Sequence, residues 1–62
     1  MSVIYEHEIH RFLRENGGSS SRKEIYKALG DNAASRRMID DKLRMMERFG
    51  LVVIHEEEVK IK

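Results

Sequence analysis

The chain has 62 residues and a formal net charge of +1, which allows one domain with one hydrophobic core and no separate catalytic module. It has no cysteine to form a disulfide, and three scattered histidines make no convincing metal site, so we expect a homodimer in which a second subunit adds stability. No apolar run reaches the roughly 20 residues of a membrane span and the start lacks a secretory signal pattern, so we expect no membrane contact and a cytoplasmic location.

Positive charge is concentrated in the middle of the sequence. Residues 19–48 hold eight Lys and Arg against five acids, a net of +3, whereas the remaining residues hold four basic and six acidic side chains, a net of −2. A surface that binds nucleic acid would therefore have to lie in the middle of the chain.

The first predicted element is a helix from about Ser2 to Asn16. Its apolar residues recur at i, i+4, i+7 and i+8, which places them on one side of the helix: Tyr5, Ile9, Phe12 and Leu13. Gly17 suits the left-handed conformation that often ends a helix. His7 and His10 share a face of this helix, but two ligands of one type are better interpreted as surface histidines than as a metal site.

The second predicted element is a short helix that begins at Ser21 and ends at Gly30. Serines 19–21 are interpreted as a loop, with the last of them as the helix cap. Ser21-Arg22-Lys23-Glu24 forms a capping box, in which the Ser21 hydroxyl accepts from the Glu24 amide and the Glu24 carboxylate accepts from the Ser21 amide. The apolar residues of this helix follow at i, i+3 and i+4: Ile25, Ala28 and Leu29.

The third predicted element is a helix over residues 33–49, capped by Asn32 and stopped by Gly50. Its apolar residues fill an arc of about 160°, wider than the roughly 100° that a core-facing helix usually shows: Met38, Ile39, Leu43, Met45, Met46 and Phe49. We therefore expect this helix to bury one face in the core and another against a second subunit. Lys42 lies inside the arc and is expected to extend its charged end to water.

The chain ends in a predicted antiparallel hairpin, with strands at residues 51–55 and 58–62 joined by a turn at 56–57. In the second strand Val59 and Ile61 are expected to face the core, and the two lysines beside them to face water. Because a two-stranded hairpin is barely stable alone, it must pack against the helices. The predicted fold is α+β: three helices and then a two-stranded hairpin, in a single domain spanning residues 1–62.

Three groups of residues share a pattern with a known family: Arg22-Lys23-Glu24-Ile25-Tyr26-Lys27-Ala28-Leu29-Gly30, then Ile39, Leu43, Met46 and Glu47, then Phe49-Gly50-Leu51-Val52-Val53. From Arg22 to Val53 the sequence resembles the winged helix-turn-helix of repressors of the multiple-antibiotic-resistance and arsenical-resistance types. The resemblance implies a small winged helix that binds DNA as a transcriptional regulator, with the helix at 33–49 as recognition helix. The segment between Gly30 and Gly50 is a few residues longer than in the family.

The predicted wing tip is acidic, with Glu56, Glu57 and Glu58 where a wing that binds phosphate would carry Arg or Lys. We therefore carry no wing contacts over from the family, and the sequence leaves open whether the acidic wing contacts DNA or a protein partner.

Opposite the apolar arc of the third helix, Arg37, Arg44 and Arg48 fall within about 40° of one another. A helix in the major groove contacts bases from its early turns, and arginine matches the paired acceptors of guanine. Arg37 is the first candidate for a base contact and Arg44 the second. Ser35 and Arg36, in the first turns, are candidates for base or phosphate contacts.

Two residues at the start of the second helix complete the predicted DNA-binding set. Arg22 and Lys23 lie beside amides that we expect to be free, an arrangement that suits phosphate binding. The full set is Arg22, Lys23, Ser35, Arg36, Arg37, Arg44 and Arg48.

The arginine stripe has a simpler alternative interpretation. Asp40 is spaced four residues from Arg36 and from Arg44, and Asp41 four residues from Arg37, so the stripe is also what a solvated helix face with weak ion pairs would show.

Two other classes of function fit parts of the sequence. A docking module for another protein is favoured by the acidic turn, the small net charge and the wide apolar arc. RNA binding is less favoured because three of the four aromatic side chains are expected to be buried, leaving no stacking platform: Tyr5, Phe12, Tyr26 and Phe49. The sequence offers no nucleophile with its base, glycine-rich phosphate loop or catalytic carboxylate pair, so neither an enzyme nor a bound cofactor is expected.

Overall fold

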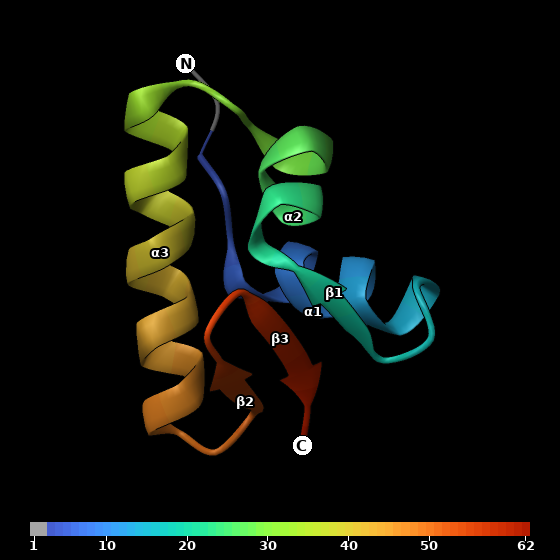
Figure 1. The fold of residues 1–62 in the computed structure, drawn as a ribbon. Helices are drawn as coiled ribbons and strands as arrows, with labels where there is room; N and C mark the ends of the chain where they lie inside the picture. The colour runs from blue at the N-terminus through green and yellow to red at the C-terminus, as the bar shows by residue number, and fades with distance from the viewer. Residues whose placement is uncertain (1–2) are drawn as a thin grey trace.

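A computed structural model describes residues 3–62, and within them it holds three helices and a three-stranded antiparallel sheet. The elements follow the order α1 (Glu6–Glu15), β1 (Ser19–Ser21), α2 (Arg22–Leu29), α3 (Ala33–Arg48), β2 (Val52–His55) and β3 (Glu58–Ile61). The long α3 runs along one side of the molecule, α1 and α2 lie on the other, and the sheet closes one end (Figure 1). The predicted α+β class is confirmed.

The sheet has one strand more than the sequence predicts. Its order is β1-β3-β2, so β3 lies between the predicted hairpin partner and a third strand made of serines 19–21. Ser19 pairs with Lys60 and Ser20 with Val59. The prediction that these serines form only a loop and a cap is wrong, because strand pairing uses backbone groups and β3 offers an otherwise open edge.

The core lies between the helices and one face of the sheet. The second strand of the hairpin alternates as expected, since Val59 is buried and Ile61 half-buried, whereas Lys60 and Lys62 are exposed. Every element except β1 contributes to the buried cluster, as does the segment before α1. Its members are Ile4, Ile9, Leu13, Ile25, Ile39, Leu43, Met46, Val52 and Val59.

Helix α1 begins later than predicted. Tyr5 is its N-cap in extended conformation, and the Tyr5 amide donates to Glu8 Oε1 at 3.1 Å. The extended segment points Ile4 into the core and leaves Tyr5 51% exposed, so Tyr5 does not join the apolar stripe. Ser2, the predicted start, lies outside the described residues. The left-handed end of the helix is confirmed, since Gly17 has φ of 78°.

The predicted caps of α2 and α3 are confirmed. Ser21 Oγ accepts from the Glu24 amide at 3.2 Å, and Asn32 Oδ1 accepts from the Ser35 amide at 2.8 Å. Among the described residues the reciprocal half of the capping box, from the Ser21 amide to the Glu24 carboxylate, is not formed; Ser21 belongs to β1 instead. These caps satisfy amides that the first turn of a helix leaves unpaired.

Only part of the wide apolar arc of α3 reaches the core. Ile39, Leu43 and Met46 are buried, whereas Met45 is 41% and Phe49 68% exposed. The helix therefore has a narrow core-facing stripe and a second apolar face that is open in the single chain. The expectation that three of the four aromatic residues are buried is wrong, because Tyr5 precedes α1 and Phe49 follows the last turn of α3.

The turn between α2 and α3 is tight at Gly30. A Cβ added at Gly30 would lie 2.6 Å from Ser35 Cβ and 2.8 Å from Ser35 Oγ. Real Cβ atoms do not approach that closely, so Gly30→Ala must push the two helices apart. We expect it to lower the free energy of unfolding by about 1–3 kcal/mol, measured by urea denaturation. Gly30→Ala should cost less unfolding free energy when it is made in a Ser35→Gly background, because the clashing Ser35 side chain is absent there. A Gly30→Ala variant as stable as the wild type would show that the contact is not tight.

Candidate nucleic-acid interface

The outward side of α3 carries three exposed arginines, Arg37, Arg44 and Arg48, which we call the arginine face. Arg44 has a side chain 78% exposed and lies 3.9 Å from Asp41 Oδ1, at the limit of an ion pair. Within residues 3–62, Arg37 and Arg48 take part in no ion pair. Three positive charges against one carboxylate give this face a net of +2, and its donors are available to a ligand.

The first turn of α3 carries only small side chains. Ala33 and Ala34 form the first turn, and both are exposed with only a methyl side chain. Small side chains allow a helix backbone to come close to a surface, and the alanine methyl group suits contact with the methyl group of thymine.

Ser35 and Arg36 are placed away from the arginine face. Ser35 is half-buried against Gly30. Arg36 donates from Nε and Nη2 to Asp31 Oδ1, at 2.9 and 2.7 Å, and its guanidinium carbon lies 5.3 Å from the centre of the Tyr26 ring. Arg36 is therefore held by a carboxylate and an aromatic face at the α2–α3 turn.

Arg22 is also held within the chain. Its Nη1 lies 3.0 Å from Asp40 Oδ1 on α3, and the Tyr26 hydroxyl donates to the same oxygen at 2.5 Å. This cluster joins α2 to the middle of α3. A charge-assisted pair of hydrogen bonds on one carboxylate fixes the orientation of α3 relative to α2.

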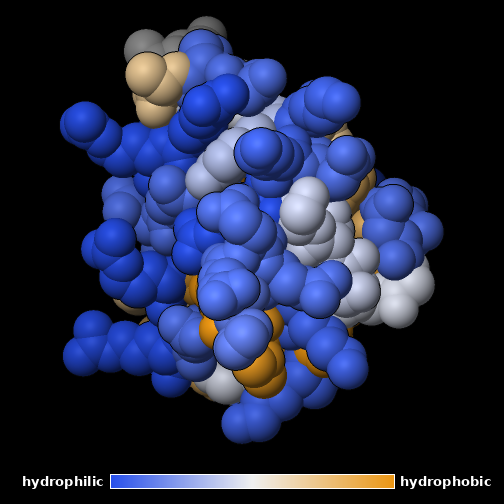
Figure 2. All heavy atoms as spheres, in the orientation of Figure 1, coloured by the Kyte–Doolittle hydropathy of each residue, from blue (hydrophilic) through white to orange (hydrophobic). Residues whose placement is uncertain are grey.

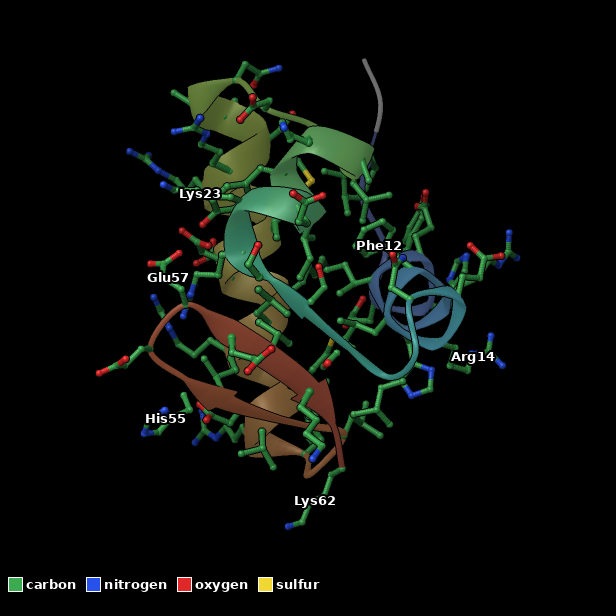
Figure 3. All side chains as sticks on the ribbon, turned by 45° about the vertical axis from the view of Figure 1, so that its right-hand side comes forward. Phe12, Arg14, Lys23, His55, Glu57 and Lys62 are labelled. Carbon is green, nitrogen blue, oxygen red and sulfur yellow. The ribbon has the colours of Figure 1, made fainter. Side chains whose placement is uncertain are left out.

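The expectation of free amides at the start of α2 is wrong for Arg22. The Arg22 amide donates to the Glu57 carbonyl at 2.8 Å, and the Glu24 amide donates to Ser21 Oγ as the predicted cap requires. Lys23 is exposed, and Figure 3 shows it on the same side of the molecule as Glu57, with Arg14 on the opposite side. Lys23 therefore remains the phosphate candidate at this helix end.

The i, i+4 ion pairs of the alternative interpretation are not formed within residues 3–62. Asp40 binds Arg22 in place of Arg36, and Arg36 binds Asp31. Both pairs join a residue of α3 to a residue outside that helix, and both include hydrogen bonds of 3.0 Å or less. Within residues 3–62 the carboxylate of α3 that pairs with the arginine face is Asp41, 3.9 Å from Arg44, while Asp40 and Glu47 of the same helix line a pocket together with Arg44.

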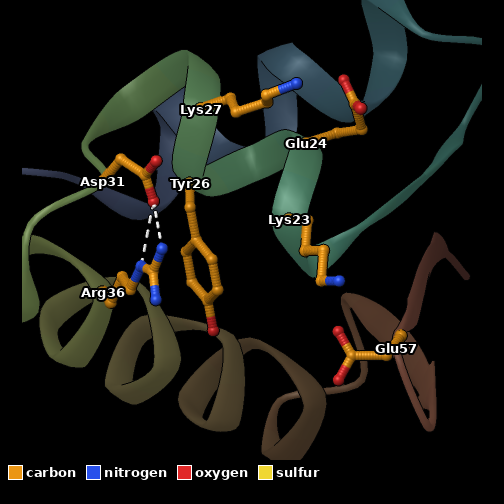
Figure 4. Close-up of a pocket in the computed structure, with 7 residues that line it drawn as sticks. All are labelled: Lys23, Glu24, Tyr26, Lys27, Asp31, Arg36 and Glu57. Carbon is orange, nitrogen blue, oxygen red and sulfur yellow. Dashed lines mark hydrogen bonds and ion pairs between the residues drawn. The ribbon is translucent and has the colours of Figure 1, made fainter.

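A cleft of about 420 Å³ lies between α2, the start of α3 and the hairpin turn (Figure 4). Its three cations face three carboxylates, of which Asp31 already binds Arg36. Lys27 is absent from the predicted DNA-binding set, although its spacing of four residues from Lys23 places both on one side of α2. The lining residues are Lys23, Glu24, Tyr26, Lys27, Asp31, Arg36 and Glu57.

The hairpin turn beside this cleft carries Glu56, Glu57 and Glu58, all exposed, which we call the acidic turn. Glu56 adopts the left-handed conformation, with φ of 58°. The hydrogen bond from the Arg22 amide to the Glu57 carbonyl holds the turn against the start of α2. In Figure 2 hydrophilic side chains cover most of the visible face, and apolar atoms gather low on it, over the hairpin.

Tyr26 makes the α2–α3 cluster sensitive to high pH. Burial raises the pKa of the Tyr26 hydroxyl, and its hydrogen bond to Asp40 raises it further. Because the pKa is higher in the folded chain than in the unfolded one, the contribution is complete below about pH 10 and is lost as pH rises through the folded pKa. We expect Tyr26→Phe to cost about 1–2 kcal/mol of unfolding free energy at neutral pH. This cost should shrink above about pH 10 in urea denaturation of both proteins, and parallel pH curves would contradict the assignment.

Within residues 3–62 no helix is long and apolar enough to cross a membrane. The same residues contain no group of three or more His, Cys, Asp or Glu side chains placed to hold a metal ion. No family model, no curated protein and no solved structure matches this chain. Its function must therefore be argued from the arrangement of its own side chains.

Proposed function

We propose that this chain is a winged helix-turn-helix domain that binds double-stranded DNA sequence-specifically as a transcriptional regulator, with α3 as the recognition helix. The observation that carries the proposal is the arginine face: Arg37, Arg44 and Arg48 are exposed on one helix, and within residues 3–62 only Arg44 has an ion-pair partner, Asp41 at 3.9 Å. Outward arginines on a helix are the side chains best suited to read guanine in the major groove.

The element order supports this function. Helix α2 leads into α3 through a short turn, and β2 and β3 form a hairpin beside α3, so α3 occupies the recognition position and the hairpin the position of a wing. β1, which the sequence did not predict, adds a third strand that ties the hairpin to the start of α2. The hairpin is thereby joined to the part of the fold that positions α3.

The dimensions of α3 fit a groove. Arg37 and Arg44 are seven residues apart on the same face, which separates them by about 10 Å along the helix, roughly three base-pair steps. Ala33 and Ala34 allow the first turn to approach the groove floor, so Arg37 reaches bases first. Arg48, at the far end of the helix, is assigned to the DNA backbone.

Phosphate contacts are assigned to the two lysines of α2. Lys23 and Lys27 are exposed and take part in no ion pair within residues 3–62. Arg22 and Arg36 contribute only when a phosphate oxygen replaces Asp40 or Asp31 as their acceptor. The acidic turn repels the backbone next to Lys23 and so disfavours nonspecific binding.

The direct test is fluorescence anisotropy of a labelled random-sequence duplex at about 50 and 200 mM salt. The three phosphate contacts assigned to Lys23, Lys27 and Arg48 would weaken binding by roughly 40-fold over this range, because each contact releases condensed counterions. Binding that is absent, or independent of salt, would refute DNA binding. A steep salt dependence would justify selection of the operator sequence from random duplexes.

A docking module for another protein is the second candidate function. It is favoured by the acidic turn, which lies beside the start of α2 where a DNA-binding surface gains from positive charge. If the duplex affinity is absent or does not change with salt concentration, protein docking becomes the better explanation.

A further inference from the structure

The turn between α1 and β1 places an asparagine directly before two glycines. Asn16 is exposed and is followed by Gly17 and Gly18. Both glycines have positive φ, and a Cβ added at either one would meet no atom of another part of the chain within 4 Å. In Figure 1 this turn projects from the right-hand edge of the molecule. The space beside the Asn16–Gly17 peptide is therefore open.

An asparagine that precedes a glycine loses its side-chain amide without an enzyme. The backbone nitrogen of the glycine attacks the side-chain carbonyl carbon, a new carbon–nitrogen bond forms, and the side-chain nitrogen leaves as ammonia with the proton of the attacking nitrogen. Water then opens the five-membered succinimide at one of its two carbonyl carbons, which gives aspartate or isoaspartate. Glycine favours the attack because it has no side chain to crowd the ring, and asparagine is among the thermally labile residues.

The chain contains its own comparison for Asn16. The sequence has two asparagines and no glutamine, so Asn32 carries the one other side-chain amide. Asn32 precedes Ala33, whose methyl group crowds the ring that a glycine leaves open. Its Oδ1 accepts from the Ser35 amide at 2.8 Å, which holds the side chain as the cap of α3. The residue that follows each asparagine therefore favours reaction at Asn16.

In the folded turn both reacting groups are tied to the end of α1. Asn16 Nδ2 donates to the Phe12 carbonyl at 2.7 Å, and the Gly17 amide donates to the Arg14 carbonyl at 3.3 Å. Both acceptors belong to the last turn of the helix. Helix ends fray, so breaking these two hydrogen bonds requires only local opening. The attack therefore does not require global unfolding, and fraying of this turn sets its rate.

We propose that Asn16 is a site of spontaneous deamidation, and that its conversion to isoaspartate detaches the α1 end of β1 from β3. Isoaspartate adds one methylene to the main chain directly before Gly17. The Gly18 amide donates to the Leu13 carbonyl at 2.7 Å, and the Gly18 carbonyl accepts from the Ile61 amide at 2.8 Å. A longer main chain displaces Gly18 from one of these partners. This inference is independent of DNA binding.

The new charge acts in the same direction as the longer main chain. The product carries a carboxylate at the C-terminal end of α1, where the helix dipole is negative, and the donor to the Phe12 carbonyl is lost. β1 has only three residues, and its other end is held by the Arg22 amide, which donates to the Glu57 carbonyl. Loosening therefore begins at Gly18 and leaves the β2–β3 hairpin in place.

The first test is incubation of the full chain at mildly alkaline pH, where the attacking nitrogen loses its proton more readily. Peptide mass spectrometry distinguishes an amide from a carboxyl group at each asparagine. Asn16 should convert at least about tenfold faster than Asn32, which corresponds to about 1.4 kcal/mol between the two barriers. Asn16→Gln is the matched control and should keep its amide, because a glutamine must close a larger ring.

A synthetic peptide of residues 12–21 reports the reaction without the fold. A full chain whose Asn16 keeps its amide while this peptide loses it would overturn the proposal, because the folded turn would then prevent the attack.

The second test is amide hydrogen exchange of the isolated isoaspartate form. Protection of the Ile61 amide should fall at least about tenfold, whereas the β2 amides that pair with β3 keep theirs. Asn16→Asp introduces the charge with a main chain of normal length, so it should retain most of the Ile61 protection. Unchanged Ile61 protection in the isoaspartate form would refute the detachment of β1.

Discussion

Replacing Arg37 and Arg44 together by alanine is expected to weaken duplex binding by about 10²- to 10³-fold, because each arginine that reaches a base contributes roughly 1–3 kcal/mol. Both side chains are exposed and neither supports the core, so the variant should remain folded. Alanine also has the highest helix propensity, which keeps α3 intact. The measurement is fluorescence anisotropy on the selected operator duplex at low salt, where the wild-type affinity is highest.

Arg11→Ala is the matched control for this loss. Arg11 is an exposed arginine on α1 and lines a shallow surface with Arg14 and Glu15, away from α3. Its removal should change affinity by less than about twofold, the effect of one distant, screened charge. Equal losses in Arg11→Ala and in the α3 variant would show that net charge, and not the arginine face, determines binding.

The helices could be predicted from the sequence because their signals are local. Ser21 and Asn32 each accept from an amide three residues ahead, and Gly17 ends α1 with a conformation that suits glycine. Each of these interactions depends on residues within one turn of a helix, so the sequence around it contains all the information.

The third strand could not be predicted because its cause lies far along the chain. Serines 19–21 have no strand propensity of their own, and they become β1 by pairing with β3, about 40 residues later. The sequence around the serines indicates a cap and a turn, and it is consistent with a loop as well as with a strand. Only the open edge of β3, which exists after the hairpin has packed, distinguishes a strand from a loop.

The same contrast applies to the DNA-binding candidates. Helical spacing places Arg37, Arg44 and Arg48 on one face, and the structure leaves all three exposed. Spacing says nothing about Arg22, whose partner is 18 residues away, nor about Arg36, whose partner lies before the helix. A helical wheel shows neighbours within a helix, whereas these two arginines take their partners from outside it.

Neighbouring methionines of α3 offer the sharpest test of the orientation on which the DNA-binding proposal depends. Met46 is 1% exposed and Met45 is 41% exposed, although the two residues are adjacent and identical in chemistry. Met46→Ala is expected to lower the free energy of unfolding by about 2–5 kcal/mol, through lost burial and the cavity left behind. Met45→Ala should cost well under about 1 kcal/mol when measured at low protein concentration, where dimerisation contributes little.

The expected loss is large for a domain of this size, whose total stability is roughly 3–9 kcal/mol at 0.05–0.15 kcal/mol per residue. Urea denaturation followed by circular dichroism measures both variants, and an unchanged slope shows that the folded state stays compact. A reversed order, with Met45→Ala the more damaging, would mean that α3 is rotated by about 100°. The arginine face would then turn toward its neighbours, so this one comparison tests the geometry on which the DNA-binding proposal depends.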